Sequence, residues 1–291
     1  MNIYNCYKYK LITNMKINAM TVDVEDYFQV SAFEPYIDRD NWDILPHRVE
    51  HNTHKILDSF DKKNIKATFF TLGWVAERYP SLIRRIVRDK HELASHGFNH
   101  IRVNKQTLEQ FRSDVSTSKK LLEDISGIVV NGYRAASYSI GVTNQWALSV
   151  LQEEEYKYSS SIYPVKHDLY GIPNAPRYVY HPIENNSFKE IPISTIRLGE
   201  KNYPCGGGGF FRFYPYCLSK WALHQINNIE KKSAIFYFHP WEIDPDQPRQ
   251  KGLDYKTQFR HYLNLNKMES RVNKLLIDFQ WDTMAKVFEI N

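Results

Sequence analysis

The sequence has little of what marks several large classes of protein. Its 291 residues include only three cysteines, Cys6, Cys205 and Cys217. That number is too small for a disulfide framework and favours free thiols in a reducing compartment. No apolar run approaches the roughly 18 residues of a membrane span, and the polar start lacks the apolar core of a signal peptide. We therefore predict a cytoplasmic protein without stable membrane insertion.

The positive charge of the chain is small and dispersed. The net charge of +5 comes without any basic run longer than a Lys-Lys or Arg-Arg pair. Because nucleic-acid-binding surfaces usually concentrate their basic residues in one patch or stripe, we predict no nucleic-acid partner. The sequence leaves the oligomeric state open.

Segments with the character of strands alternate with segments that have helical periodicity. We expect strands within 19–24, 66–72, 91–95, 128–133, 190–194 and 234–238, and helices within 49–60, 80–87, 107–126, 146–155, 218–227 and 267–279. This alternation indicates an α/β fold with a parallel sheet or barrel. We predict a disordered or non-native lead-in over 1–16, with Met15 or Met20 as an alternative start. Residues 17–291 then form one domain with a C-terminal helical extension.

The segment from Glu92 to His100 carries the most specific signal. It places His96 and His100 four residues apart after a short apolar run, a spacing that lets both imidazoles reach one metal ion. The acidic cluster of Asp23, Glu25 and Asp26 also follows an apolar run. Two imidazoles and a carboxylate make a common divalent metal site with open positions for water.

Polar residues recur where the predicted strands end. The acidic cluster, the histidine pair, Arg134 and His239 each follow a different strand. The carboxyl ends of parallel strands face one rim, where ligands bind in α/β folds. Polar residues that follow four different strands and meet at one rim favour an active site.

Four motifs give the chain its resemblance to a known family. They occur in the order Thr21-Val-Asp-Val-Glu-Asp26, Ser95-His-Gly-Phe-Asn-His100, Gly132-Tyr-Arg-Ala-Ala-Ser-Tyr138 and Phe236-Tyr-Phe-His239. This set resembles the polysaccharide deacetylases of the NodB-homology class, carbohydrate esterase family 4. The stretches 23–28, 72–80, 167–173, 206–212 and 239–244 are similar to the exopolysaccharide deacetylases associated with exosortase (PEP-CTERM) systems.

The resemblance implies a distorted, incomplete (β/α) barrel and a metal-dependent hydrolase. Its reaction would remove N-acetyl groups from an amino-sugar glycan, either an exopolysaccharide or a lipid-linked precursor. It implies a divalent ion, with zinc expected, held by His96, His100 and a carboxylate. Asp23 would be the general base, His239 the general acid, and Arg134 the partner that keeps Asp23 ionised.

The identity of the metal-binding carboxylate stays open at this stage. Strand alternation puts Asp23 and Glu25 on one side and favours Glu25, whereas a turn after Val24 would bring in Asp26. Tyr138, Trp241 and Gly208 are candidate substrate-binding residues. For the two aromatic residues, packing in the core is an equally good explanation.

Three positions depart from the family pattern. Gly97 follows the first motif histidine where Ser or Thr is common, Ala136 stands where Pro is usual, and Ser159 occupies a usual Asp position. Two alternatives to the deacetylase function stay open, and Ala136 and Ser159 suggest the second of them. One is a small-amide hydrolase of the same superfamily, similar to allantoinase, and the other is a catalytically weak glycan-binding protein.

Overall fold

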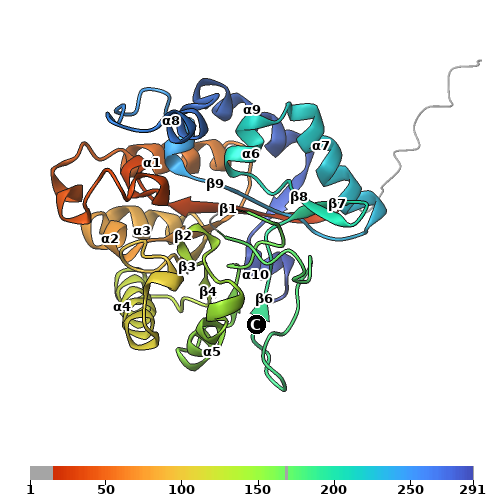
Figure 1. Cartoon of the computed structure of the whole chain (residues 1–291), viewed down its shortest axis with the longest axis horizontal. Coiled ribbons are helices and arrows are strands. Elements are labelled where there is room, and N and C mark those ends of the chain that lie inside the picture. The colour runs from red at the N-terminus through yellow and green to blue at the C-terminus, as the bar shows by residue number, and fades with distance from the viewer. Residues whose placement is uncertain (1–15, 168–169, 291) are drawn as a thin grey trace, which may run out of the picture.

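Strand β1 (Ile17–Val24) is the centre of a curled parallel sheet. The structure is a computed structural model that describes residues 16–167 and 170–290, and Figure 1 shows the whole arrangement. Strand β9 (Ile235–Phe238) pairs with one edge of β1. Strands β2 (Thr68–Thr71) and β10 (Gln280–Asp282) pair with the other edge, β2 along residues 21–24 and β10 along residues 17–19. The sheet continues from β2 through β3 (Glu92–Ser95), β4 (Gly132–Tyr133), β5 (Tyr158–Ser159) and β6 (Lys189–Glu190).

Helices cover the outside of this sheet. Figure 1 shows the helices of the first half along one flank and most of those of the second half along the other, while α10 lies beside β6. The first group is α1 (Val49–Asp61), α2 (Gly73–Arg78), α3 (Pro80–Arg88), α4 (Leu108–Ser126) and α5 (Trp146–Glu153). The second is α6 (Gly208–Phe213), α7 (Tyr216–His224), α8 (Tyr255–Tyr262), α9 (Leu265–Asp278) and α10 (Met284–Val287). The arrangement confirms the predicted incomplete α/β barrel.

The two faces of the sheet have different surroundings. In β1, Met20 and Val22 belong to the large core between sheet and helices. Ala19 belongs to a smaller cluster inside the curl, together with Phe70 of β2 and Tyr237 of β9. Because side chains alternate along a strand, each strand contributes to both layers, and the inner layer carries the site described below.

Capping residues determine where several elements begin and end. Thr107 caps α4 and forms a capping box with Gln110, and Gly127 ends that helix in the left-handed conformation with φ 72°. The predicted strand over 190–194 is shorter than expected. Strand β6 ends at Glu190, close to Pro192, which has no N–H to donate to a ladder.

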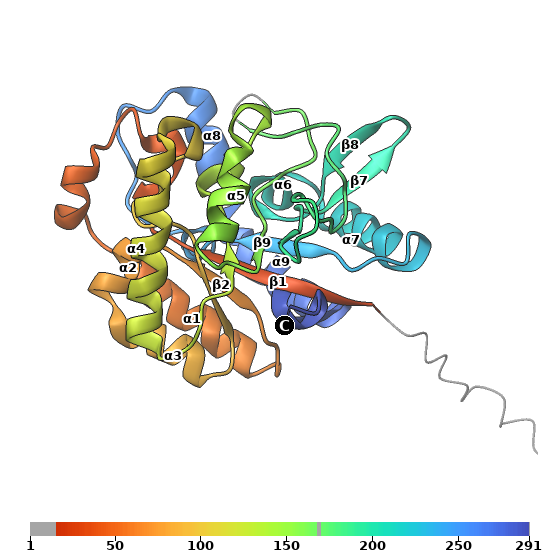
Figure 2. The ribbon, with the colours of Figure 1, turned by 90° about the horizontal axis from the view of Figure 1, so that it is seen from below.

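An antiparallel hairpin, β7 (Thr195–Leu198) with β8 (Lys201–Pro204), was not predicted. It projects from the body of the molecule in Figure 2. No helix in the described part of the chain is both long and apolar enough to cross a membrane. Residues 1–15 of the predicted lead-in lie outside the described residues.

The glycine run after β8 lies against the backbone of β9. Gly207 forms a parallel bridge with Tyr237, and the Tyr237 N–H donates to the Gly206 carbonyl at 2.7 Å. Gly207 has φ +128°, and a Cβ there would stand 1.9 Å from the Tyr237 carbonyl oxygen. Only glycine allows this close approach. It places the glycine run along the edge of β9 that does not pair with β1.

Replacing Gly207 with alanine should therefore destabilise the fold. We expect Gly207→Ala to lower the free energy of unfolding by about 2 kcal/mol or more, because strain and a backbone clash add. Gly209→Ala is the matched control, since its Cβ would meet nothing closer than 3.8 Å. Urea denaturation of both variants makes the measurement. Equal losses in the two would refute the close-approach explanation.

Candidate active site

Strand alternation brings the predicted site residues to the inside of the curl. Ala94 and Tyr237 belong to the inner cluster, so His96 and His239, two residues further along their chains, also face inward. In β1, Asp23 lies four residues after Ala19, which belongs to the same inner cluster, so the Asp23 side chain also faces inward. The side chains of Asp23, His96 and His239 line one cavity of about 430 Å³ at the carboxyl ends of the strands.

Glu25, His96 and His100 form a group of potential metal ligands. Each offers a ligand atom within 4.8 Å of the others, and all three residues are buried. The Nδ1 of His96 donates to the Arg134 carbonyl at 2.7 Å, which leaves Nε2 as the free lone pair. Burial lowers the pKa of His96 to about 4, so the ring is neutral at physiological pH, as metal binding requires.

The polar atoms of this group are incompletely satisfied. The Nε2 of His100 lies 2.8 Å from Oε2 of Glu25, but the two are not aligned as a hydrogen bond. Within the described residues, Glu25 Oε2 and His100 Nδ1 have no hydrogen-bond partner. Buried acceptors without donors are costly. One carboxylate and two imidazoles are also a donor set that zinc and similar divalent ions accept. The residues therefore fit a divalent metal.

The electrostatics keep Glu25 ionised. Burial raises its pKa, but the fields of His100 and His239 outweigh that effect and hold the pKa below its usual range. The Nε1–H of Trp241 donates to Glu25 Oε1 at 3.1 Å. Glu25 is thus available as an anionic ligand, held from one side by the indole.

Asp26, the other candidate ligand, points elsewhere. Its carboxylate accepts from the backbone N–H groups of Tyr27, Arg48 and Val49 at 2.8, 2.6 and 2.9 Å. Burial raises its pKa to about 6. The side chain caps local backbone, and the structure brings Glu25 rather than Asp26 to the histidine pair.

Asp23 forms a buried ion pair with Arg134. Nη1 of Arg134 donates to Asp23 Oδ1 at 2.5 Å and to Thr21 Oγ1 at 2.8 Å, and its guanidinium carbon lies 3.9 Å from the centre of the Phe70 ring. Arg134 is completely buried. The other carboxylate oxygen of Asp23, Oδ2, accepts from the Tyr138 hydroxyl at 3.4 Å. The pair leaves one carboxylate oxygen of Asp23 toward the cavity.

His239 belongs to a chain of charges that sequence reasoning did not identify. Its Nδ1 lies 2.7 Å from Oε1 of Glu242, and Glu242 forms an ion pair with Arg212 at 2.6 Å. Burial lowers the pKa of His239, but Glu25 and Glu242 raise it more, to about 9. Nε2 faces Asp23 Oδ2 at 3.9 Å. The His-x-x-Glu spacing at 239–242, opening at Pro240, was the available signal.

The predicted substrate-binding residues have different places. Tyr138 and Trp241 line the cavity, although Trp241 is 5% exposed and stacks between His239 and His261. Gly208 is not among the described residues that line the cavity. A Cβ on Gly208 would stand 2.5 Å from the Tyr237 hydroxyl, so its role is packing.

The departures at Gly97 and Ser159 are accommodated by neighbours. Gly97 has φ +77°, and a Cβ there would stand 2.7 Å from Asp114, which accepts from the Phe98 N–H in the turn between the two histidines. Ser159 is buried in β5, and its hydroxyl lies 2.7 Å from that of Ser161. The carboxylate partner of His239 is Glu242, so Ser159 does not leave that histidine without one.

Comparisons with known proteins divide the chain in two. Residues 41–159 match the polysaccharide deacetylase family model, and residues 160–289 match a domain of unknown function, DUF3473. The peptidoglycan-N-acetylglucosamine deacetylase PgdA of Listeria monocytogenes is 24% identical over 157 residues, 52% of this chain and 34% of that protein. A peptidoglycan-N-acetylglucosamine deacetylase of Bacillus cereus is 33% identical over 75 residues, 26% of this chain and 27% of that one. The matches thus span about a third or less of these relatives.

Solved structures share the fold over nearly the whole chain. A candidate polysaccharide deacetylase from Mycobacterium smegmatis superposes with a TM-score of 0.62 at 16% identity, covering 95% of this chain and 90% of that one. A CE4 family pseudoenzyme from Bacillus anthracis superposes with a TM-score of 0.50 at 12% identity, covering 94% and 66%. The sequence matches support the polysaccharide deacetylase family, and the structural likeness shows its fold.

The neighbouring carboxylates Glu25 and Asp26 offer a matched test of metal binding. Glu25→Gln should lower the metal content well below one equivalent, because it removes the only carboxylate of the group. Asp26→Asn should keep the metal, since its side chain caps backbone. Elemental analysis after dialysis against zinc measures both. Full metal content in Glu25→Gln, with loss in Asp26→Asn, would reverse the assignment.

Proposed function

We propose that this chain, which residues 41–159 link to the polysaccharide deacetylase family, is a metal-dependent N-deacetylase of an acetylated amino-sugar glycan. One observation carries the proposal. The group of Glu25, His96 and His100 opens into the same cavity as Asp23 and His239, so a metal ligand set, a base and an acid face one space. The relatives named above act on peptidoglycan, which is itself an acetylated glycan.

The proposed ion, held by Glu25, His96 and His100, would polarise the amide carbonyl and make water more acidic. Asp23 takes a proton from the attacking water as general base. Its ion pair with Arg134 keeps that carboxylate ionised and fixes its direction. The water oxygen bonds to the amide carbon.

His239 supplies the second proton transfer. Glu25 and Glu242 both raise the pKa of His239, and the Glu242 carboxylate on Nδ1 still favours the protonated imidazole when Glu25 holds the proposed ion. The breaking C–N bond leaves its electron pair on nitrogen, which takes the proton from Nε2 of His239, and acetate and a free amine result. Glu242 holds Nδ1 and so aims Nε2 at the cavity.

We further propose that the substrate is a polymeric or lipid-linked glycan and that zinc is the physiological ion. Support for the first comes from Tyr138 in the cavity wall, because aromatic rings stack on sugars; both faces of the Trp241 ring are covered by His239 and His261. Association with an exosortase system and action in the cytoplasm stay predictions from the sequence. The small-amide and glycan-binding alternatives predict no acetate release from chito-oligosaccharides.

The role of Asp23 can be separated from that of Glu25. Asp23→Asn should keep its metal and lose at least about 10²-fold in acetate release, the scale of a lost general base. Glu25→Gln should lose activity through weaker metal binding, so excess zinc should restore part of it. Acetate release at increasing zinc distinguishes the two. Rescue of Asp23→Asn by zinc would make Asp23 a ligand instead of the base.

The pH profile tests His239 as the acid. Activity should fall as pH rises through the pKa of His239, because the acid must be protonated. Glu242→Gln removes a charge that raises this pKa, so the alkaline limb of kcat should move to lower pH by about one unit. Asp244→Asn, a nearby carboxylate paired with Arg48, is the control and should leave the limb unmoved. An unchanged limb in Glu242→Gln would exclude His239 as the titrating acid.

A further inference from the structure

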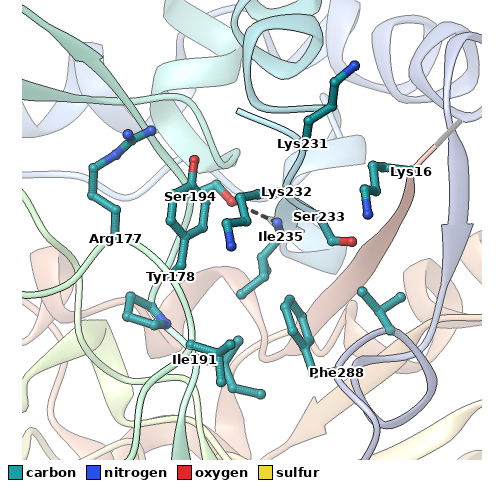
Figure 3. A pocket seen from close by; sticks show the side chains of 13 residues that line it. Lys16, Arg177, Tyr178, Ile191, Ser194, Lys231, Lys232, Ser233, Ile235 and Phe288 are labelled. Atoms are coloured by element: carbon teal, nitrogen blue, oxygen red, sulfur yellow. Dashed lines mark hydrogen bonds between the residues drawn. The ribbon is translucent and has the colours of Figure 1, made fainter. Parts of the chain in front are cut away.

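A second cavity lies at the opposite edge of the sheet from the catalytic rim. It has a volume of about 280 Å³ and is lined by residues next to the amino ends of β1 and β9, among them Lys16 and Ser233. Figure 3 shows it from close by. Because all strands of the main sheet run parallel, this edge is separated from Asp23 and His239 by the length of the strands.

The lining of this cavity is strongly cationic. Lys16, Arg177, Lys231 and Lys232 contribute to it, and no Asp or Glu is among its thirteen described lining residues. Arg177 is neutralised by Glu230 at 2.7 Å. Within the described part of the chain, Lys16 and Lys231 pair with no carboxylate. In Figure 3 the Lys16 and Lys232 side chains extend toward the cavity, whereas Lys231 extends outward.

Two serine hydroxyl groups contribute to the polar side of the cavity. Ser194 and Ser233 both line it. The oxygen of Ser194 accepts from the Ile235 N–H at 2.7 Å, so its own hydrogen is free to donate to a ligand. Ser194 is 6% exposed. Lysines and a preset hydroxyl donor thus converge on the cavity from segments that are distant in the sequence.

The remaining wall is apolar. Ile191, Ile235, Val287 and Phe288 form part of it. A cavity with ammonium groups on one side and aliphatic and aromatic side chains on the other suits a ligand that joins an anion to an apolar group. A phosphate has more acceptor oxygens than a carboxylate, so it suits a site with several donors and positive charge better than a carboxylate does. Lysine is also a common phosphate ligand.

We propose that this cavity binds a phosphate-bearing ligand, with Lys16, Lys232 and Ser194 as its donors. The phosphate belongs either to a free phosphorylated compound or to an amphiphile whose apolar part lies on Phe288 and Val287. The site is independent of the catalytic cavity, because the two share no lining residue among those described.

The test compares two double variants by calorimetric titration of the full chain with inorganic pyrophosphate and with dodecyl phosphate below its micelle concentration. Lys16→Ala/Lys232→Ala removes the two inward lysines, and Lys62→Ala/Lys267→Ala removes the same charge from exposed positions outside the cavity. The wild type should bind at least one ligand with a saturable isotherm. The first variant should bind it about tenfold or more weakly, while the control stays within about twofold. Circular dichroism melts check that both variants fold.

The result also identifies the source of the phosphate. Tighter binding of dodecyl phosphate than of pyrophosphate supports an amphiphile, and the reverse order supports a free phosphorylated compound. Equal weakening in the two double variants would show that only general charge attracts the anion and would overturn the proposal. Absence of saturable binding to the wild type for both probes would overturn it as well.

Discussion

The alternation of side chains along β1 is the constraint on which the rest of this structure depends. A strand presents only every second residue to one face. In β1 this rule sends Met20 and Val22 to the helices and Ala19 to the interior of the curl. Asp23 and Glu25 follow on the inner side, and Asp26 turns outward to cap backbone. One strand therefore delivers both the proposed base and the proposed ligand, while the third carboxylate becomes structural.

Charges buried at such a place need partners that are fixed before any substrate arrives. Arg134 forms an ion pair with Asp23. Glu242, which is itself paired with Arg212, forms the ion pair with His239. A buried ion pair costs desolvation free energy that only good geometry offsets, so these pairs serve orientation more than stability. Glu25 is the exception, because Oε2 has no hydrogen-bond partner among the described residues. The proposed divalent cation would give this oxygen a partner.

Much of this arrangement could be predicted from sequence because it follows from local rules. The strand ends, the histidine pair and the cap at Thr107 each depend on a few adjacent residues. The role of Glu242 could not be predicted, since the i,i+3 spacing to His239 becomes informative only when the fold buries the carboxylate beside that partly buried histidine. For Gly208, a glycine run indicates a close approach but not which neighbour is approached, and here that neighbour is Tyr237. The β7–β8 hairpin offered only short strands with mixed polarity.

The proposed deacetylation depends on a single divalent ion held by Glu25, His96 and His100. Acetate release from chito-oligosaccharide by metal-free protein titrated with zinc tests this dependence most directly. We expect negligible release without metal, a linear rise, and a plateau at one equivalent. Full release by the metal-free protein, or a plateau only at two equivalents, would contradict it.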